Sequence, residues 1–278
     1  MFGCHGVLFA KSSTCRASTM RLPDSYFENT ATVLDVGGWF KPDLRATHVV
    51  DLMPWETRGA RLSLEKRPQE SFSKETWTQA DFLSADFSLP FGDKSFDLVI
   101  CGHTIEDLAA PERLLNEISR VGKAGVIECP SRITEQTMGI RDRMATRPGH
   151  PHHHWIVESL SGDLVLYSKQ DSGLCTGARV IPLTVTEAYL ADNPGEDVVI
   201  HRWQNQISFR MITGVECVRR AEAFVSSMKI SRLDRAKDRL LRSARRTRDG
   251  LRGKFKEDYS WWDRILEESR PFSRIKLK

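Results

Sequence analysis

The sequence predicts an α/β fold built on a doubly wound, mostly parallel β-sheet. Its apolar segments are continuous rather than alternating, which is typical of strands buried on both faces. A helical pattern lies between two of these segments, and acids or glycines stand where the segments end. The chain has 278 residues, of which 40% are hydrophobic and 28% charged, as expected of a globular domain with appendages.

The expected elements follow in order along the chain. Three apolar segments, Thr32–Val36, Ala46–Leu52 and Ser95–Gly102, predict strands, and Thr76–Phe82 is a weaker strand candidate between the last two. A helix begins near Pro111, which suits a first helical position, and ends near Gly122. Its apolar face consists of Leu114, Leu115, Ile118 and Val121. The segment Ala124–Pro130 is the next buried strand, and this alternation of strands and helix predicts βαβ units.

The chain divides into three parts. Residues 1–30 show no firm periodicity and are interpreted as an N-terminal leader. Residues 31–213 form the α/β domain, with later strands in Asp163–Lys169 and Asp197–Ile212. Within it, residues 131–160 are polar, rich in histidine and broken by prolines, so we expect a surface loop insertion. Residues 214–278 are expected to be a helical, basic C-terminal extension.

Positive charge is concentrated in the C-terminal extension. Residues 229–256 contain 12 Lys and Arg against 3 Asp, whereas the whole chain carries a formal charge of only +4. Apolar residues at helical spacing favour a helix packed along one side, namely Ile230, Leu233, Leu240, Ala244, Leu251 and Phe255. The alternatives are contact with an anionic surface or ligand, such as a membrane or a glycan. Nucleic acid is the least favoured partner, because no base-reading motif is present.

Compartment is inferred from the cysteines and the apolar runs. None of the six cysteines forms a CxxC pair, and Cys101 and Cys129 lie in core-strand segments, so we expect buried free thiols. The longest apolar runs fall well short of the ~20 residues of a membrane span. The N-terminus lacks the pattern of a secretory signal, and we therefore predict a cytoplasmic protein.

Polar residues stand at the ends of four predicted strands, where open parallel sheets bind ligands. The first strand ends on Asp35, Gly37 and Gly38, the second on Asp51, and the fourth on Gly102 and His103, while Asp86 follows the third. The glycine loop is altered: Trp39 and Lys41 occupy its later glycine places. A pyrophosphate needs a full glycine loop that runs into a helix N-terminus. The pattern therefore favours a nucleoside-type ligand without phosphate over NAD.

The segment "LPFGDKSFDLVICGHTIEDL", together with "VLDVGG", "VVD" and "PERLLNEISRV", resembles class I S-adenosylmethionine-dependent methyltransferases of the type 11 kind. The resemblance covers about residues 32–131, and the histidine run and "GGWFKP" are similar to a bacterial branch of methyltransferase-like proteins. It implies a Rossmann-like methyltransferase fold, S-adenosyl-L-methionine as cofactor, and a small-molecule or glycan acceptor. Trp39 departs from the family pattern and puts the fit of the loop to the cofactor in question.

The resemblance also implies a role for each matching residue. Asp35, Gly37 and Gly38 would line the methionine end of the cofactor, and Asp51 with Leu52 would hold the ribose. Asp86 and Phe87 would contact the adenine, and Cys101, Gly102 and His103 would lie beside the sulfonium. Glu106 and Asp107 follow His103 and are candidates for orienting a substrate.

The histidine run 149–155 supports two hypotheses. One of its histidines, His150 or His153, could act as a general base on an acceptor hydroxyl, and His103 is the other catalytic candidate. A metal site is the alternative, but adjacent histidines of an extended segment point to opposite sides, so at most His152 and His154 share a face. We therefore predict no metal site. The rival function is a catalytically inactive methyltransferase-like binding or assembly protein, which would apply if Trp39 fills the methionine pocket.

Overall fold

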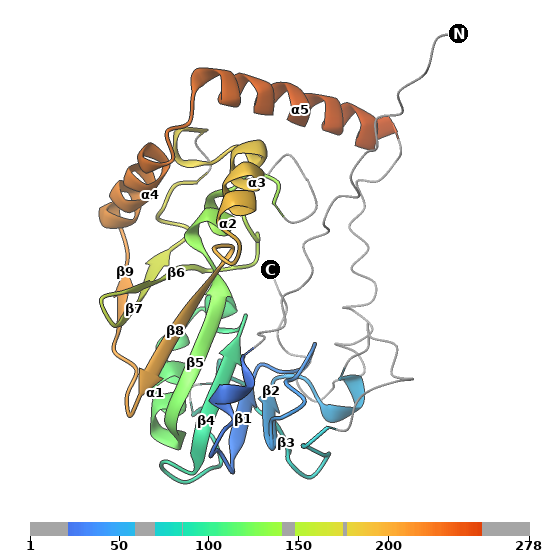
Figure 1. Cartoon of the computed structure of the whole chain (residues 1–278), viewed down its shortest axis with the longest axis vertical. Helices are drawn as coiled ribbons and strands as arrows, with labels where there is room; N and C mark the ends of the chain where they lie inside the picture. The colour runs from blue at the N-terminus through green and yellow to red at the C-terminus, as the bar shows by residue number, and fades with distance from the viewer. Residues whose placement is uncertain (1–21, 59–69, 85, 141–147, 175–176, 252–278) are drawn as a thin grey trace.

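The computed structural model describes residues 22–58, 70–84, 86–140, 148–174 and 177–251, and its centre is a six-stranded sheet. The strand order is β3-β2-β1-β4-β5-β8, and Figure 1 shows these strands side by side in the lower half of the molecule. Their bounds are β1 (Val33–Val36), β2 (His48–Asp51), β3 (Trp77–Gln79), β4 (Phe96–Gly102), β5 (Gly122–Pro130) and β8 (Val198–Gln204). All neighbours are parallel except β5 and β8. The predicted mostly parallel α/β sheet is confirmed.

One face of the sheet is covered by α1 (Pro111–Val121) and by strands of a second sheet. The predicted apolar face of α1 is confirmed, since Leu114, Leu115, Ile118 and Val121 are all completely buried. They join the strand residues Leu34 and Val99 and the second-sheet residues Val157 and Leu166 in one cluster. This face therefore holds the main core of the domain.

The opposite face is covered without an α-helix in the described residues. The eleven residues between β1 and β2 form turns and bends, and the 3-10 turns Asp24–Tyr26 and Trp55–Thr57 lie nearby in the chain. Aromatic side chains take over the role of a helix in covering this face, and they include Trp39, Phe72 and Trp77. They pack on the outward residues of the strands, such as Val49 and Ile100.

A second, three-stranded sheet has the order β6-β7-β9. It contains β6 (Trp155–Leu160), β7 (Asp163–Ser168) and β9 (Phe209–Ile212). The segment Asp197–Ile212, predicted as one strand region, is therefore split between the two sheets. Strand β6 was not predicted as a strand, because the histidines before it give the region a polar composition.

The interpretation of residues 131–160 as a surface loop is wrong for most of the described part. This segment contains the short helix α2 (Arg132–Gln136) and the whole of β6, and α2 is buried along its entire length. Its polar side chains tolerate burial because they bond to one another or to nearby backbone. Arg132 pairs with Glu158, for example, and the Gln136 amide donates to the carbonyl groups of Arg179 and Ala221.

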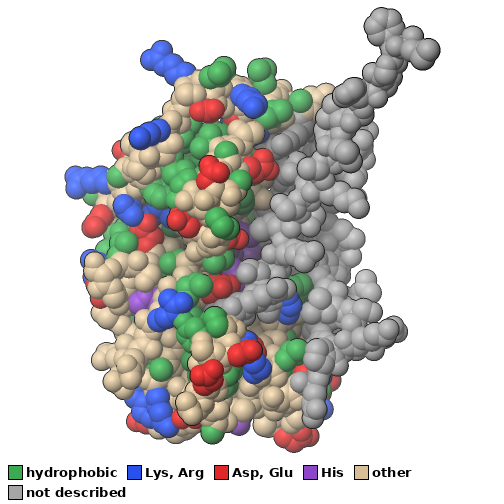
Figure 2. All heavy atoms as spheres, in the orientation of Figure 1, with side chains coloured by type: hydrophobic (Ala, Val, Ile, Leu, Met, Phe, Trp, Pro, Cys, Tyr) green, Lys and Arg blue, Asp and Glu red, His purple; other side chains and the backbone are tan. Residues whose placement is uncertain are grey.

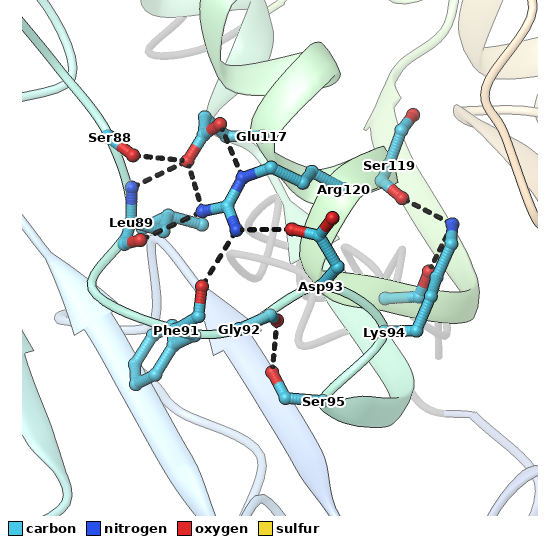
Figure 3. A network of polar contacts seen from close by, with 11 residues as sticks. Ser88, Leu89, Phe91, Gly92, Asp93, Lys94, Ser95, Glu117, Ser119 and Arg120 are labelled. Carbon is cyan, nitrogen blue, oxygen red and sulfur yellow. Dashed lines mark hydrogen bonds and ion pairs between the residues drawn. The ribbon is translucent and has the colours of Figure 1, made fainter.

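The loop between β3 and β4 is held against α1 by a polar network that Figure 3 shows. Arg120 of α1 donates to the carbonyl oxygens of Phe91 at 2.8 Å and Leu89 at 2.9 Å. It also pairs with Asp93 and with Glu117, whose carboxylate accepts the amide N–H of Leu89. The "LPFGDKSFD" segment thus owes its shape to α1, which fixes where β4 begins.

Helices make up the described C-terminal part, with α3 (Leu183–Asp192), α4 (Val215–Ser227) and α5 (Arg232–Leu251) at the end of the molecule away from the start of β4 in Figure 1. The predicted packed stripe on α5 is wrong, because Leu233 and Leu240 are 76% and 72% exposed. The buried position on α5 is instead Asp238, which pairs with Arg242. Leu251 and Phe255 lie outside the residues whose side chains are described.

The described surface has mixed charge. Figure 2 shows Lys and Arg side chains distributed among Asp and Glu side chains over the visible face. Cys101, Cys129 and Cys217 are free and buried, as predicted for the first two, while Cys4, Cys15 and Cys175 lie outside the described residues. Among the described helices, none combines the length and apolar character that crossing a bilayer requires.

Candidate active site

The strand register brings the predicted site residues to one edge of the central sheet. Asp35 in β1 is level with Val49 in β2 and Ile100 in β4, so the carboxyl ends of these strands lie side by side. Gly102, at the end of β4, is level with Glu128 in β5. Asp35, Asp51 and His103 therefore share the edge at which parallel α/β sheets bind ligands.

Asp35 and Asp51 are buried carboxylates whose bonding partners are backbone amides. Asp35 is 6% exposed and accepts the N–H of Asp43 at 2.7 Å. Asp51 is 7% exposed and accepts the N–H of Trp39 at 2.9 Å and of Met53 at 2.8 Å. Burial raises the pKa of Asp35 to about 7 and that of Asp51 to about 6, although the amide donors act in the opposite direction. Both groups are thus prepared for a ligand that donates hydrogen bonds or carries positive charge.

The Trp39 side chain packs on the sheet and covers it. Its ring is 8% exposed, belongs to the aromatic cluster on the face opposite α1, and donates its indole N–H to the Thr57 carbonyl at 2.9 Å. No α-helix of the described residues belongs to this cluster. The ring is consequently occupied in covering that face and in linking the connections that follow β1 and β2.

Gly37 and Gly38 are required by close packing at the end of β1. Gly37 has φ +79°, and a Cβ there would lie 1.9 Å from Oγ1 of Thr104. A Cβ on Gly38 would lie 3.0 Å from the Asp35 carboxyl group. Any side chain at these positions would displace the turn that follows β4 or the Asp35 carboxylate.

Gly37→Ala is expected to destabilise the protein by about 1–3 kcal/mol, because Ala would be strained at positive φ and would overlap Thr104. Urea denaturation would measure the effect. Gly92→Ala is the matched control, since nothing lies within 4 Å of the added methyl group there. Equal effects of the two substitutions would contradict the packing argument.

The predicted adenine contacts lie on the loop after β3. Asp86 is exposed, and Phe87 packs against the main core, 5.5 Å from the Phe82 ring between centroids. Gln79, the last residue of β3, lies beside the end of β2, where its side-chain amide donates to the Leu52 carbonyl at 2.9 Å. Gln79 was not predicted, although its polar side chain at the end of a strand was visible in the sequence.

His103 lies between two carboxylates after β4. It has φ +51°, and its Nε2 is 3.1 Å from Glu128 Oε1 while its Nδ1 is 3.6 Å from Glu106 Oε1. Burial lowers the pKa of His103, but the two nearby carboxylates, Glu106 and Glu128, outweigh this and raise it to about 10. The imidazole is therefore a cation at neutral pH, and the three groups together carry a net negative charge.

Glu106 is the buried polar group with the most unused bonding capacity at this edge. It is 1% exposed, and neither carboxylate oxygen has a hydrogen-bond partner among the described residues. A buried carboxylate in this state is costly unless a ligand or water satisfies it. Together with Asp35 and Asp51, it provides carboxylates that accept hydrogen bonds and attract positive charge at the strand ends. Such groups suit a cofactor with hydroxyl, ammonium and sulfonium groups.

The histidine run lies against the turn Ile105–Asp107. His154 donates its backbone N–H to the Glu106 carbonyl at 2.7 Å, and the Trp155 indole donates to the Leu108 carbonyl at 2.8 Å. His153 is buried, with Nδ1 2.8 Å from Glu135 Oε1 and Nε2 3.5 Å from Asp107 Oδ1. His153 lies beside the carboxylate of Asp107, and His103 lies beside that of the preceding residue, Glu106. The two histidines thus face neighbouring carboxylates of one turn.

The expectation that only His152 and His154 share a face is wrong. The chain turns at Pro151, where the His153 N–H donates to the His150 carbonyl at 3.2 Å, so the run is not extended. His150, His152 and His153 come together, while His154 is exposed. The proline between His150 and His152 was the sequence signal for this turn.

Glu128 and Glu135 are site residues that the sequence analysis missed. Glu128 lies in the apolar segment "GVIECP", and a charge inside a buried strand was the signal. Glu135 is 1% exposed and also pairs with Lys169; burial acts to raise its pKa, but His153 and Lys169 hold it at about 2. No spacing rule marked Glu135, since its partners are distant in sequence.

Residues 43–127 match a protein family described as "Methyltransferase domain". The match includes Asp51, Asp86, Gly102 and His103, and it begins after the altered glycine loop. No curated protein matches the chain.

Solved structures of methyltransferases are among the similar folds, at low similarity. YcgJ from Bacillus subtilis is 20% identical over 36% of this chain and 44% of its own, with a TM-score of 0.27. A complex between the Haloferax volcanii Trm112 methyltransferase activator and a methyltransferase is 19% identical over 49% of this chain and 67% of its own, with a TM-score of 0.30. An S-adenosylmethionine-dependent methyltransferase from Mesorhizobium loti is 16% identical over 70% of this chain and 72% of its own, with a TM-score of 0.29. The chain thus spans less than half of YcgJ, and at these TM-scores the structures add no weight to the family match.

Residues 43–127 are thus similar to the methyltransferase domain family. The mostly parallel sheet and the acids at its strand ends agree with this similarity, since a Rossmann-like methyltransferase fold has such a sheet.

Proposed function

We propose that the protein transfers a methyl group from S-adenosylmethionine to an oxygen or nitrogen atom of a small molecule or glycan. The observation that carries this proposal is the pair of buried carboxylates, Asp35 and Asp51, at adjacent strand ends beside His103 and Glu106. Carboxylates with raised pKa values in such a position are typical of functional sites. Burial of Trp39 on the sheet face further supports an open methionine side.

Each predicted residue has a role in this proposal. Asp35, Gly37 and Gly38 hold the methionine end, and Asp51 with Leu52 holds the ribose. Asp86 and Phe87 hold the adenine, and Gly102 allows close approach at the end of β4. When bound, S-adenosylmethionine supplies the activated methyl group that an acceptor nucleophile displaces.

The protein's own contribution is charge and alignment. The two carboxylates beside His103, Glu106 and Glu128, favour a cationic group at the end of β4. Glu135 orients His153 through its Nδ1, which leaves Nε2 toward the Asp107 side for contact with an acceptor. His103 and His153 remain the catalytic candidates, with His103 as a charged donor and His153 on the acceptor side.

Calorimetric titration of the full chain with S-adenosylmethionine and S-adenosylhomocysteine tests this function. We expect micromolar binding, with at least about a tenfold loss in Asp51→Ala, because a buried hydrogen-bond acceptor for the ribose is removed. Asp192→Ala changes an exposed acid on α3 and should bind like the unaltered protein. Circular dichroism of each variant must show a folded protein before a loss counts.

A catalytically inactive binding or assembly protein is the second candidate. The observation in its favour is that the loop already satisfies Asp51 through two backbone amides and closes Gly37 against Thr104. Absence of binding to both ligands by the folded protein would contradict the enzyme and support this alternative. The free buried cysteines fit a cytoplasmic location for either function.

A further inference from the structure

We propose that His152, His153 and Asp107, with His150 beside them, form a binding site for a divalent transition-metal ion, with Zn²⁺ as the expected occupant. None of these residues holds the cofactor in the proposed function, although His153 is also one of its catalytic candidates. The cluster includes Asp107 of the turn Ile105–Asp107. Its evidence is geometric and comes from three features.

The first feature is that ring nitrogens of three histidines and a carboxylate oxygen of Asp107 lie close together. One ring nitrogen from each of His150, His152 and His153 lies within 4.8 Å of the other two. Asp107 Oδ1 is 3.5 Å from Nε2 of His153 and 3.7 Å from Nε2 of His152. Zn²⁺ bound tetrahedrally at about 2.0–2.1 Å separates neighbouring ligand atoms by about 3.3–3.4 Å. The two separations from Asp107 Oδ1 are thus close to the spacing that a bound ion requires.

The second feature is that these separations do not suit hydrogen bonds. Distances of 3.5 and 3.7 Å are at or beyond the limit for a hydrogen bond between side chains. In the same network, His153 Nδ1 makes a well-formed contact of 2.8 Å with Glu135. The longer separations lie around Asp107, whereas the contact between His153 and Glu135 is a hydrogen bond.

The third feature is support of the ligands from behind. Metal-binding histidines usually donate their other ring N–H to a carboxylate, which fixes the tautomer and the ring orientation. Glu135 fills this position for His153 and is itself buried and paired with Lys169. Lys169 also donates to the His150 carbonyl at 2.6 Å, and His150 stacks on His153 with centroids 4.5 Å apart. Two of these supporting residues, His153 and Glu135, are buried.

The ligand types select the metal. Imidazole nitrogens with one carboxylate oxygen suit Zn²⁺ and neighbouring transition metals, whereas Mg²⁺ and Ca²⁺ prefer oxygen ligands alone. Cysteine is absent from the cluster, which makes a closed cysteine-rich zinc site inapplicable. We therefore expect selectivity for Zn²⁺ over Mg²⁺.

The test uses the full chain, freed of any affinity tag and of metal by chelation, titrated calorimetrically with ZnCl₂. We expect one equivalent to bind, and His152→Gln to weaken it by at least about tenfold. His152 is half exposed, so this variant should fold. His154→Gln is the matched control, because His154 belongs to the same run but lies outside the cluster. Asp107→Asn and Glu135→Gln are expected to weaken binding by about 10- to 100-fold if they act as ligand and support.

A second measurement guards against non-specific binding by a histidine-rich segment. Co²⁺ in place of Zn²⁺ should give the intense visible bands of a low-coordinate nitrogen and oxygen site, and His152→Gln should remove them. Equal weakening by His154→Gln, binding of several equivalents, or no Zn²⁺ binding by the folded protein would each overturn the proposal. None of these readouts depends on methyl transfer, so the site and the proposed function can fail separately.

Discussion

Asp35→Asn is expected to make the protein more stable at pH 8 by about 2–4 kcal/mol, and to abolish cofactor binding at the same time. Burial raises the pKa of Asp35 from its usual 3.8 to about 7. Each pH unit between the folded and unfolded values is worth about 1.4 kcal/mol. The folded state keeps the proton between pH 4 and 7 while the unfolded state loses it, so the free energy of unfolding falls as pH rises through this range.

The amide of Asn removes the cost of ionising a buried group and can still accept the N–H of Asp43. The gain should accordingly be full at pH 8 and disappear near pH 4. Urea denaturation at both pH values measures it, with Asp192→Asn on the surface of α3 as the control. If Asp35→Asn instead lowers the free energy of unfolding at pH 8, the hydrogen bonds of the carboxylate stabilise the protein by more than its burial destabilises it. Greater stability together with lost binding is the pattern of a residue retained for function.

Glu158→Gln is expected to destabilise the protein by about 3–5 kcal/mol, because it leaves a buried arginine without its counter-charge. The Arg132 side chain of α2 is 2% exposed; its Nε lies 2.9 Å from Glu158 Oε1, and its Nη2 donates a hydrogen bond to Glu158 Oε2 at 3.2 Å. Arg220 of α4 bonds both oxygens of the same carboxylate, at 2.7 and 2.9 Å. One side chain of β6 thus joins α2 and α4 to the second sheet.

Chemical denaturation of the variant measures this effect. Glu222→Gln is the matched control, since Glu222 lies on α4 and pairs with Arg179 but is about half exposed, so its ion pair should matter little. The double variant Arg132→Met with Glu158→Leu should recover part of the loss by replacing the ion pair with apolar contacts. A small effect of Glu158→Gln, equal to that of the control, would contradict the importance of the pair.

Much of the fold followed from the sequence because its signals were local. The strands β1, β2, β4 and β5 are continuous apolar runs, and the buried face of α1 repeats at helical spacing. The strand-end acids also followed, since the carboxyl ends of parallel strands meet at one edge. Their bonding partners did not follow, because a backbone amide such as that of Trp39 leaves no trace in residue type.

The second half of the site was less predictable because its order depends on distant pairs. Glu135 finds Lys169 and His153, and Arg132 finds Glu158, across the chain. Polar composition alone indicated a surface loop, whereas mutual pairing allows burial. On α5, the spacing of Leu233 and Leu240 correctly indicated a helix but not which face it buries.

The aromatic cover on the face opposite α1 has a consequence for the order of folding. A helix between β1 and β2 would have covered that face through contacts close in sequence, but the cluster here collects residues from 22 to 126. Chain entropy must be lost before such distant contacts form, and folding through them is slow. The unit of β4, α1 and β5 is contiguous from residue 96 to 130, so its contacts join residues that are closer in sequence than those of the aromatic cluster. We infer that His103 and Glu128 take their places early, and that Asp51 completes the ligand edge late.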